Sequence, residues 1–389
     1  MDFGVPLEPV RTAVIGAGDI SEVYLNTIDR SPALTLCGIA SGSMTSAHEK
    51  AERYGVEART LEALLSDTSV ELLVNLAPGH AHDEINERII AADKHLYTEK
   101  PFSISVTKAA KLVQEAERRG VMIASAPDTF FGAGHQVARR VLDSGGIGKP
   151  VFGISTIGHA GVEQYHPSPA SFYRPGGEPP RDIGPYYIAQ WVNLLGPVRS
   201  VYASSARGAA ERTVLRGPTA GTQFPVDICT TYSAVLTFAE ATVSLVTSLD
   251  MANPAPHQNH CYGSEAALVL PDPNFFGGEP FLLRRGLDPK PVPLDGLPFG
   301  APNRTNHAGL AVADYRGVGL LDLAIAHRRG TKHRTSAAFI LHICEVVEAI
   351  MASARSGEAR AIETQCRRPD AVDFPRDTDL IALMPSPWP

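Results

Sequence analysis

The sequence predicts an α/β protein of two domains, in which a parallel sheet with helices on both faces precedes a mixed or antiparallel sheet with one open face. Three observations support this prediction. The chain has 389 residues, which is enough for about two domains of ordinary size. Residues 1–127 alternate between strand-like and helix-like patterns, whereas residues 128–389 are dominated by strand-like runs and long loops. We therefore expect domains at 1–127 and 128–389.

The first domain is expected to alternate strands and helices. Thr12–Ile15 is a short apolar run that ends in glycines, which is typical of a buried parallel strand. Ile20, Tyr24 and Ile28 follow at four-residue spacing, as on the buried face of a helix. Gly120 is a suitable C-terminal stop for a later helix. The same patterns predict strands at 34–40, 70–76, 95–98 and 121–125, and helices at 47–54, 83–92 and 105–119.

The second domain is expected to be built on strands. Apolar or alternating runs predict strands at 150–158, 198–204, 233–238, 241–248 and 266–270. Proline- and glycine-rich stretches at 166–180 and 271–302 indicate long loops. A helix is expected at about 335–354, because Ile340, Cys344, Val347 and Met351 share one face.

Composition excludes several classes of protein. Lys and Arg number 35 against 42 Asp and Glu, a net charge of −7, so no broad basic surface is available for nucleic acid or an anionic membrane. No apolar run reaches the roughly 18 residues of a membrane helix, and the start of the chain lacks a secretory pattern. The five cysteines are odd in number and show no CxxC spacing. We expect a cytoplasmic protein without a metal site.

A glycine-rich turn follows the first predicted strand. In Gly16-Ala17-Gly18-Asp19-Ile20, the first glycine permits a tight turn and the second lets a pyrophosphate approach the backbone at a helix N-terminus. The second strand ends at Ser41, where neither the carboxylate that binds an NAD ribose nor an arginine for a 2′-phosphate is present. No carboxylate would repel a 2′-phosphate there, and the hydroxyls of Ser41 and Ser43 could bind one. The sequence therefore predicts a dinucleotide site for NAD or NADP and slightly favours NADP.

A second motif, Glu99-Lys100-Pro101, follows the strand predicted at 95–98. The carboxyl ends of strands are where open α/β sheets bind ligands. Lys100 would serve as a general acid or base if burial or a neighbouring charge lowered its pKa. Taken alone, a Glu-Lys-Pro sequence more often forms a charged turn.

Together these motifs resemble the Gfo/Idh/MocA oxidoreductases, which include glucose–fructose oxidoreductase and inositol dehydrogenases. The resemblance covers most of the chain and is carried by Gly16-Ala17-Gly18, by residues 77–82 (APGHAH), by Thr98-Glu99-Lys100-Pro101, and by a block from Gly176-Gly177 through residues 181–186 (RDIGPY). It implies a Rossmann domain followed by a domain with a large, open, mostly antiparallel sheet. It also implies that this sheet packs against a second subunit, which predicts a homodimer or homotetramer.

The resemblance implies catalytic roles for Lys100, Asp182 and Tyr186. The family's lysine lies beside the nicotinamide and the substrate hydroxyl, and its aspartate contacts substrate. Tyr186 stands where the family usually has a catalytic histidine, so either Lys100 or Tyr186 could accept the proton. We favour Lys100, because its motif is intact.

The predicted cofactor-binding residues come from the glycine turn, the second strand end, the loop expected to form the nicotinamide-side wall, and the lysine motif: Gly16, Gly18, Asp19, Ile20, Ser41, Asn75, Leu76, Ala77, Pro78, His82, Glu99 and Lys100. Asp128 is also a candidate, although capping of the next segment is an equally good role for it. The predicted substrate-binding residues are Asp182, Tyr186 and polar residues of a stretch that could equally be a solvated loop: His159, Glu163, Tyr165, His166, Tyr173 and Arg174.

These inferences predict an NAD(P)-dependent oxidoreductase that moves a hydride between nicotinamide and a ring hydroxyl or ketone of a sugar, glycoside or inositol-like polyol. Its partner would be a small carbohydrate, not nucleic acid or membrane. Two alternatives stay open. One is an NAD-retaining enzyme that cleaves glycosides through transient oxidation, and the other is a non-catalytic sugar sensor. The intact Lys100 argues against the sensor, and the missing histidine favours it.

Overall fold

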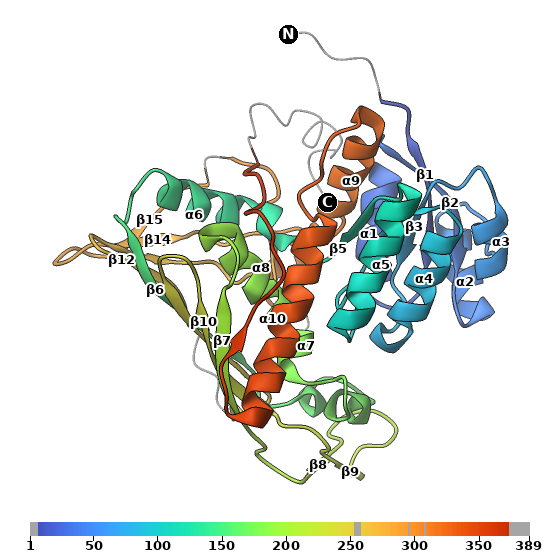
Figure 1. The fold of residues 1–389 in the computed structure, drawn as a ribbon. Coiled ribbons are helices and arrows are strands. Elements are labelled where there is room, and N and C mark those ends of the chain that lie inside the picture. Colours follow the sequence, from blue (N-terminus) through green and yellow to red (C-terminus); the bar gives the residue numbers. More distant parts are fainter. Residues whose placement is uncertain (1–6, 253–257, 295, 307–308, 373–389) are drawn as a thin grey trace. The chain divides into compact units, whose positions relative to one another are not determined.

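The chain forms two compact units (Figure 1). The computed structural model describes residues 7–252, 258–294, 296–306 and 309–372. The first unit contains described residues 7–131, 314–341 and 369–372, and the second contains those of 132–313 and 342–368. The division at 127/128 stays a prediction, and the first unit also includes a segment from late in the chain.

The first unit is built on a five-stranded parallel sheet in the order β2-β1-β3-β4-β5. Its strands are almost fully buried, as helices on both faces of a parallel sheet require. The Rossmann prediction is confirmed. The elements are β1 (Val10–Ile15), α1 (Ser21–Arg30), β2 (Leu34–Ala40), α2 (Met44–Arg53), α3 (Leu61–Ser66), β3 (Leu72–Asn75), α4 (His82–Ala91), β4 (His95–Thr98), α5 (Val106–Arg119) and β5 (Ile123–Ser125).

Local chemistry sets the ends of these helices. Helix α5 begins after Ser105, whose hydroxyl accepts a hydrogen bond from Lys108 N. It ends at Gly120, which has the left-handed φ of 69° that helix ends favour. The predicted stop at Gly120 is therefore confirmed.

Helix α9 (Val318–Arg329) joins the first unit from late in the chain and packs against β5. Both Gly317 N and Gly319 N donate to Asp128 Oδ2, each at 2.9 Å. The Thr27 hydroxyl donates to Arg316 O at 2.8 Å. These bonds tie the start of α9 to the loop after β5 and to α1.

The second unit is built on a nine-stranded sheet in the order β15-β14-β13-β12-β6-β11-β10-β7-β18. All of its neighbouring strands are antiparallel except β6 and β11, so the predicted mixed, mostly antiparallel sheet is confirmed. Its strands are β6 (Pro150–Gly158), β7 (Ser200–Ala206), β10 (Thr231–Thr237), β11 (Thr242–Ser248), β12 (Gln258–Gly263), β13 (Ala267–Val269), β14 (Phe281–Leu283), β15 (Lys290–Pro291) and β18 (Arg360–Ala361).

Two smaller pairs and several helices complete this unit. The pairs are β8 (Glu211–Thr213) with β9 (Gln223–Pro225), and β16 (Arg304–Thr305) with β17 (Ala311–Val312). Short helical turns occupy parts of the predicted loop at 166–180, namely η4 (Pro169–Tyr173) and α7 (Pro179–Asp182). Helices α6 (Ala133–Asp143), α8 (Gly184–Leu195) and much of α10 (Ala337–Ser356) cover one face of the large sheet (Figure 1).

The other face of the large sheet carries exposed apolar side chains. Along β10, buried and exposed residues alternate. Val235, 42% exposed, pairs across the strands with Tyr202, 52% exposed. Phe152 stacks on Tyr262 with ring centroids 4.4 Å apart. This face presents exposed aromatic and aliphatic side chains among the exposed hydroxyls of Ser204, Ser233 and Ser244.

Helix α10 is long and apolar enough to cross a membrane, judged by length and composition alone. One such helix is weak evidence, because core helices of globular proteins have the same composition. More than half of it is buried within the protein. We therefore assign it to the core.

Candidate active site

The two glycines of the turn after β1 differ in the space around them: Gly16 packs closely against neighbouring backbone, whereas Gly18 has free space beside it. Gly16 has a φ of +107°, and a Cβ there would lie 2.5 Å from the backbone carbonyl atoms of Leu76. A Cβ at Gly18 would meet no described heavy atom within 4 Å. Gly16 thus lets the turn pass against the end of β3, and Gly18 leaves room beside the start of α1, where Asp19 and Ile20 complete the turn. This shape fits the pyrophosphate of a dinucleotide.

The end of β2 carries hydroxyls that bond locally. Ser43 N donates to Ser41 Oγ at 3.4 Å, and Ser43 Oγ in turn accepts from Ser46 N at the start of α2. Ser41 is partly exposed. Neither bond decides between NAD and NADP, and the slight preference for NADP stays a prediction.

The loop of residues 75–78, here called the wall loop, is held at the end of β3. Asn75 is fully buried; its Oδ1 accepts from Ala77 N at 3.1 Å and its Nδ2 donates to Asn86 Oδ1 at 2.8 Å. Leu76 N bonds to Ile15 O, whereas Pro78 is exposed. The loop is therefore fixed by buried amide groups while its outer part faces solvent.

The turn Glu99-Lys100-Pro101, here called the EKP turn, lies at the end of β4, next to β3. Glu99 N donates to Asn75 O at 2.9 Å, which joins the EKP turn to the wall loop. The Glu99 side chain is 6% exposed, and both of its oxygens have partners at 2.8 Å: Tyr24 Oη donates to Oε1 and Lys100 N to Oε2. The backbone of half-buried Lys100 is thus held by the carboxylate before it.

Buried groups surround this carboxylate. Desolvation by burial, and next the charge of Glu99, hold the pKa of Tyr24 well above its usual range. Burial also raises the pKa of Tyr97 well above its usual range. Both phenols therefore stay protonated and available as donors.

The Asp128 side chain caps the start of α9, late in the chain, and not the next segment that the sequence analysis named beside cofactor binding. One of its oxygens accepts from both Gly317 N and Gly319 N, and the residue is 1% exposed. Burial raises its pKa to about 6, although the two backbone donors oppose the shift. A contact between Asp128 and the cofactor stays a prediction.

His82 begins helix α4 and is 1% exposed. Its Nδ1 lies 2.7 Å from Pro101 O and its Nε2 lies 2.7 Å from Ala77 O. The ring therefore spans from the wall loop to the EKP turn. The structure gives both of its nitrogens partners within the protein, while a role toward the cofactor stays a prediction.

In the second unit, His159 lies directly after β6. Its backbone continues the pairing with the end of β11, through His159 N to Ser248 O and Met251 N to His159 O, each at 3.2 Å. Gly161 N donates to His159 Nδ1 at 3.1 Å, so a neutral ring carries its proton on Nε2. Burial lowers the pKa of His159, and the carboxylate of Asp182 opposes that shift.

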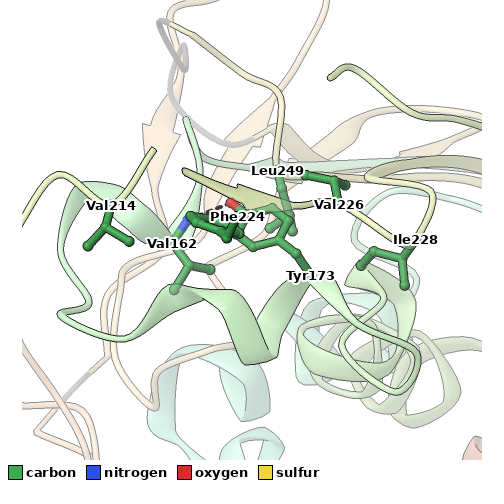
Figure 2. Packing of buried hydrophobic residues seen from close by; sticks show 7 residues of the cluster. All are labelled: Val162, Tyr173, Val214, Phe224, Val226, Ile228 and Leu249. Atoms are coloured by element: carbon green, nitrogen blue, oxygen red, sulfur yellow. Dashed lines mark hydrogen bonds between the residues drawn. The ribbon is translucent and has the colours of Figure 1, made fainter. Parts of the chain in front are cut away.

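The other predicted substrate residues of this stretch differ in exposure. Tyr165 is 49% exposed and packs edge-on against His159, Arg174 is exposed, and half-buried His166 accepts from Ser168 N. Tyr173 is fully buried. It packs among Val162, Val214, Phe224, Val226, Ile228 and Leu249, and Val162 N donates to its hydroxyl at 3.0 Å (Figure 2).

Arg212, which the sequence analysis missed, organises this stretch. Its Nη1 donates to Glu163 Oε1 at 2.6 Å and its Nη2 to Asp250 Oδ1 at 2.5 Å. The Tyr173 hydroxyl donates to the second oxygen of Glu163. We call Glu163, Tyr173, Arg212 and Asp250 the arginine cluster. Its members are far apart in the chain, so no sequence spacing signals it.

Asp182 ends α7, and Tyr186 lies in the first turn of α8 and is 4% exposed. A buried polar network anchors α8 further along its length. Trp191 Nε1 donates to Ser155 Oγ at 2.8 Å, and Gln190 Oε1 accepts from Asn259 Nδ2 at 2.7 Å. Strands β6 and β12 therefore fix the helix that carries Tyr186.

Two family models match the chain. One, described as an oxidoreductase family with an NAD-binding Rossmann fold, matches residues 10–126. The other, the GFO/IDH/MocA C-terminal domain, matches residues 135–269. Together they cover more than half of the sequence.

Among curated relatives, an uncharacterized oxidoreductase C115.03 of Schizosaccharomyces pombe is 25% identical over 57% of this chain and 64% of its own length. Inositol 2-dehydrogenase of Salmonella typhimurium is 22% identical over 42% of this chain and 50% of its own length. The matches thus span between half and just under two thirds of these relatives.

Solved structures share the fold over nearly the whole chain. Levoglucosan dehydrogenase in complex with NADH and L-sorbose aligns with a TM-score of 0.77 at 19% identity, over 91% of this chain and 99% of that one. Aldose-aldose oxidoreductase from Caulobacter crescentus, complexed with glycerol, aligns with a TM-score of 0.73 at 18% identity, over 91% and 99%.

Proposed function

This chain belongs to the Gfo/Idh/MocA oxidoreductase family, and from that premise we propose that it is an NAD(P)-dependent dehydrogenase of a sugar, glycoside or inositol-like polyol. The observation that carries the proposal is the EKP turn at the end of β4. There the buried carboxylate of Glu99 holds the backbone of Lys100, and Glu99 N bonds to the wall loop. The named relatives, an inositol dehydrogenase and sugar-binding dehydrogenases, support the substrate class.

The first unit would hold the dinucleotide. The room at Gly18 and the N-terminus of α1 suit its pyrophosphate, and the wall loop and EKP turn suit its nicotinamide end. When bound, this group supplies the carbon that accepts or donates the hydride. Ser41 would face the adenine ribose, and the missing carboxylate there slightly favours NADP.

Lys100 is proposed as the acid–base group. Oxidation of a carbinol requires a base for the hydroxyl proton as the hydride leaves. Tyrosine and lysine both have ordinary pKa values near 10, so either one needs a neighbouring group to act as a base at neutral pH. The lysine motif is intact, whereas Tyr186 stands where the family usually has a histidine. We therefore assign proton transfer to Lys100, orientation of the hydroxyl to Tyr186, and binding of the substrate to Asp182.

A screen of sugars, glycosides and inositols with NAD and NADP, followed by the absorbance of the reduced nicotinamide, tests this function. We expect Lys100→Met to abolish turnover while cofactor binding persists, and Tyr186→Phe to keep measurable activity. Turnover by Lys100→Met would overturn the role of the lysine. Equal loss in Tyr186→Phe would make the tyrosine the base.

A non-catalytic sugar sensor is the second candidate, because Tyr186 replaces the family's usual histidine. A sensor would bind a sugar and the dinucleotide without reducing or oxidising either. Sugar binding by calorimetry with no change in nicotinamide absorbance across the screen would favour it.

The open face of the large sheet is proposed to pair with a second copy in a cytoplasmic homodimer or homotetramer. The exposed apolar side chains of Tyr202, Val235 and Phe152 support this assignment. A charge at the centre of an apolar interface is costly to bury, so Tyr202→Asp should shift the protein toward monomer. Light scattering at micromolar concentration measures the change, and a monomeric wild type would contradict the proposal.

A further inference from the structure

Helix α4 binds both loops of the proposed nicotinamide site through one face. His82 and Asn86 lie four residues apart, so they share that face. Asn86 accepts from Asn75 Nδ2 at 2.8 Å and donates to Phe102 O at 3.1 Å. His82 contacts Ala77 O and Pro101 O. Each residue therefore touches both the wall loop and the segment of the EKP turn.

The two contacts of His82 set its proton count. Both partners are backbone carbonyl oxygens, and a carbonyl oxygen can only accept. A neutral imidazole carries one N–H, so one nitrogen would present a lone pair to an oxygen 2.7 Å away. An imidazolium has two N–H groups and satisfies both oxygens. The 2.7 Å distances are also in the short range of charge-assisted hydrogen bonds.

The surroundings both oppose and support a cation here. The ring is 1% exposed, and it lies at a helix N-terminus, where the helix dipole disfavours positive charge. Against this, Asp83 and Glu84 follow in the first turn of α4 and supply negative charge, part of which Lys108 Nζ offsets, 3.4 Å from Asp83 Oδ2. Two charge-assisted bonds further offset the cost of burial.

We propose that His82 is an imidazolium, protonated on both ring nitrogens, that bridges the wall loop and the EKP turn and holds them at a fixed separation. It is a positioning residue for Lys100 and for the nicotinamide end of the dinucleotide. Its effect on activity rests on the proposed function, whereas its proton count does not. Loss of either proton would leave one loop without its bond.

The proton count is tested without cofactor or substrate, by neutron diffraction from crystals of the deuterated wild-type protein at pH 7. We expect deuterium on both Nδ1 and Nε2 of His82. Deuterium on only one of the two nitrogens would overturn the proposal, whatever the protein catalyses.

The positioning role is tested with His82→Gln and, as the matched control, His80→Gln, which changes an exposed histidine of the same turn. A glutamine places its donors on one nitrogen and cannot span two separated carbonyls. We expect NADH or NADPH affinity, read by fluorescence titration, to fall about tenfold or more in His82→Gln, the scale of one lost charge-assisted bond. His80→Gln should match wild type.

Circular dichroism checks that each variant is folded. If His82→Gln does not fold, the neutron experiment on the wild-type protein decides the proposal. Equal affinity in all three folded proteins would overturn the positioning role. Absence of any nicotinamide binding by wild type would instead contradict the proposed function and leave the neutron result standing.

Discussion

The two units hold their candidate site residues by different means. In the first unit, backbone groups of the wall loop and the EKP turn bond to Asn75, Glu99 and His82, through Ala77 N, Lys100 N and Pro101 O respectively. In the second unit, the stretch after β6 depends on the arginine cluster, whose charged side chains come from distant parts of the chain. The first site is therefore held by hydrogen bonds among the two strand ends, α1 and α4, and the second by ion pairs to one largely buried arginine.

The largest effect is expected at the glycine turn, where two nearby glycines should fail differently. Gly16→Val should prevent folding of the first unit, because its φ is left-handed and the side chain would overlap the backbone of Leu76. Gly18→Val should fold but lose NAD(P) binding, because its side chain would occupy the room for the pyrophosphate. Circular dichroism measures folding and calorimetry measures binding. Unchanged NAD(P) affinity in Gly18→Val would remove the central claim.

A second large effect tests the arginine cluster. Arg212→Met leaves the carboxylates of buried Glu163 and half-buried Asp250 without their cation. Breaking a fully buried ion pair costs about 3–5 kcal/mol, and we expect a loss at the lower end of that range because Asp250 keeps its bonds from Thr230 and Thr231. We expect urea denaturation to show a loss of this size, with faster proteolysis within residues 159–183. Arg216→Met, a change at an exposed arginine nearby, is the control. Equal stability of the two variants would show that the second unit does not depend on this cation.

Acid should weaken the first unit through histidines that pack together. His95 and His327 have ring centroids 4.2 Å apart. Burial, and next the charges of His327 and Arg328, lower the pKa of His95 to about 4, although Glu71 opposes the shift. Burial, and next His95, lower the pKa of His333 to about 4.

The direction of this effect follows from proton binding. Between about pH 6.5 and pH 4 the unfolded chain binds protons at these histidines and the folded chain does not, so stability falls as the pH is lowered through that window. Buried His135 of the second unit, with a pKa lowered to about 4, adds to the same loss. Thermal melts from pH 7 to pH 4 measure it. The slope should be smaller for His95→Gln but not for exposed His48→Gln, and equal slopes would contradict the assignment.

The smallest expected effect concerns Ser41, at the partly exposed end of β2. We predict that wild type accepts NADP at least as well as NAD. Ser41→Asp should shift the preference toward NAD by about tenfold, since a nearby carboxylate repels a 2′-phosphate. Initial rates or binding constants with both cofactors measure the shift. A wild type that binds NAD alone would refute the preference for NADP.

The difference between the two units also accounts for which parts of the fold and of the candidate site could be predicted from the sequence. The strands of the first unit are short apolar runs that alternate with amphipathic helices, so most of their order was predictable. Helix α8 was not, because eleven of its twelve residues are buried and it has no polar face to give a helical period. Tyr173 was a substrate candidate by position, but its protein partners, Glu163 and Arg212, became visible only in the fold. Buried networks between distant residues leave no spacing in a sequence.

The cap on α9 has a consequence for how the protein is made. Asp128 accepts a hydrogen bond from the backbone amide of Gly317, which lies 189 residues later in the chain. At about 5–20 residues per second, a ribosome delivers α9 about 10–40 s after the carboxylate. Until then the nascent nucleotide-binding unit lacks a helix of its own outer layer, with β5 uncovered where α9 will pack. Helix α9 thus follows residues 132–313 of the second unit but precedes its residues 342–368, so the N-terminal unit stays without this helix while most of the second unit is synthesised.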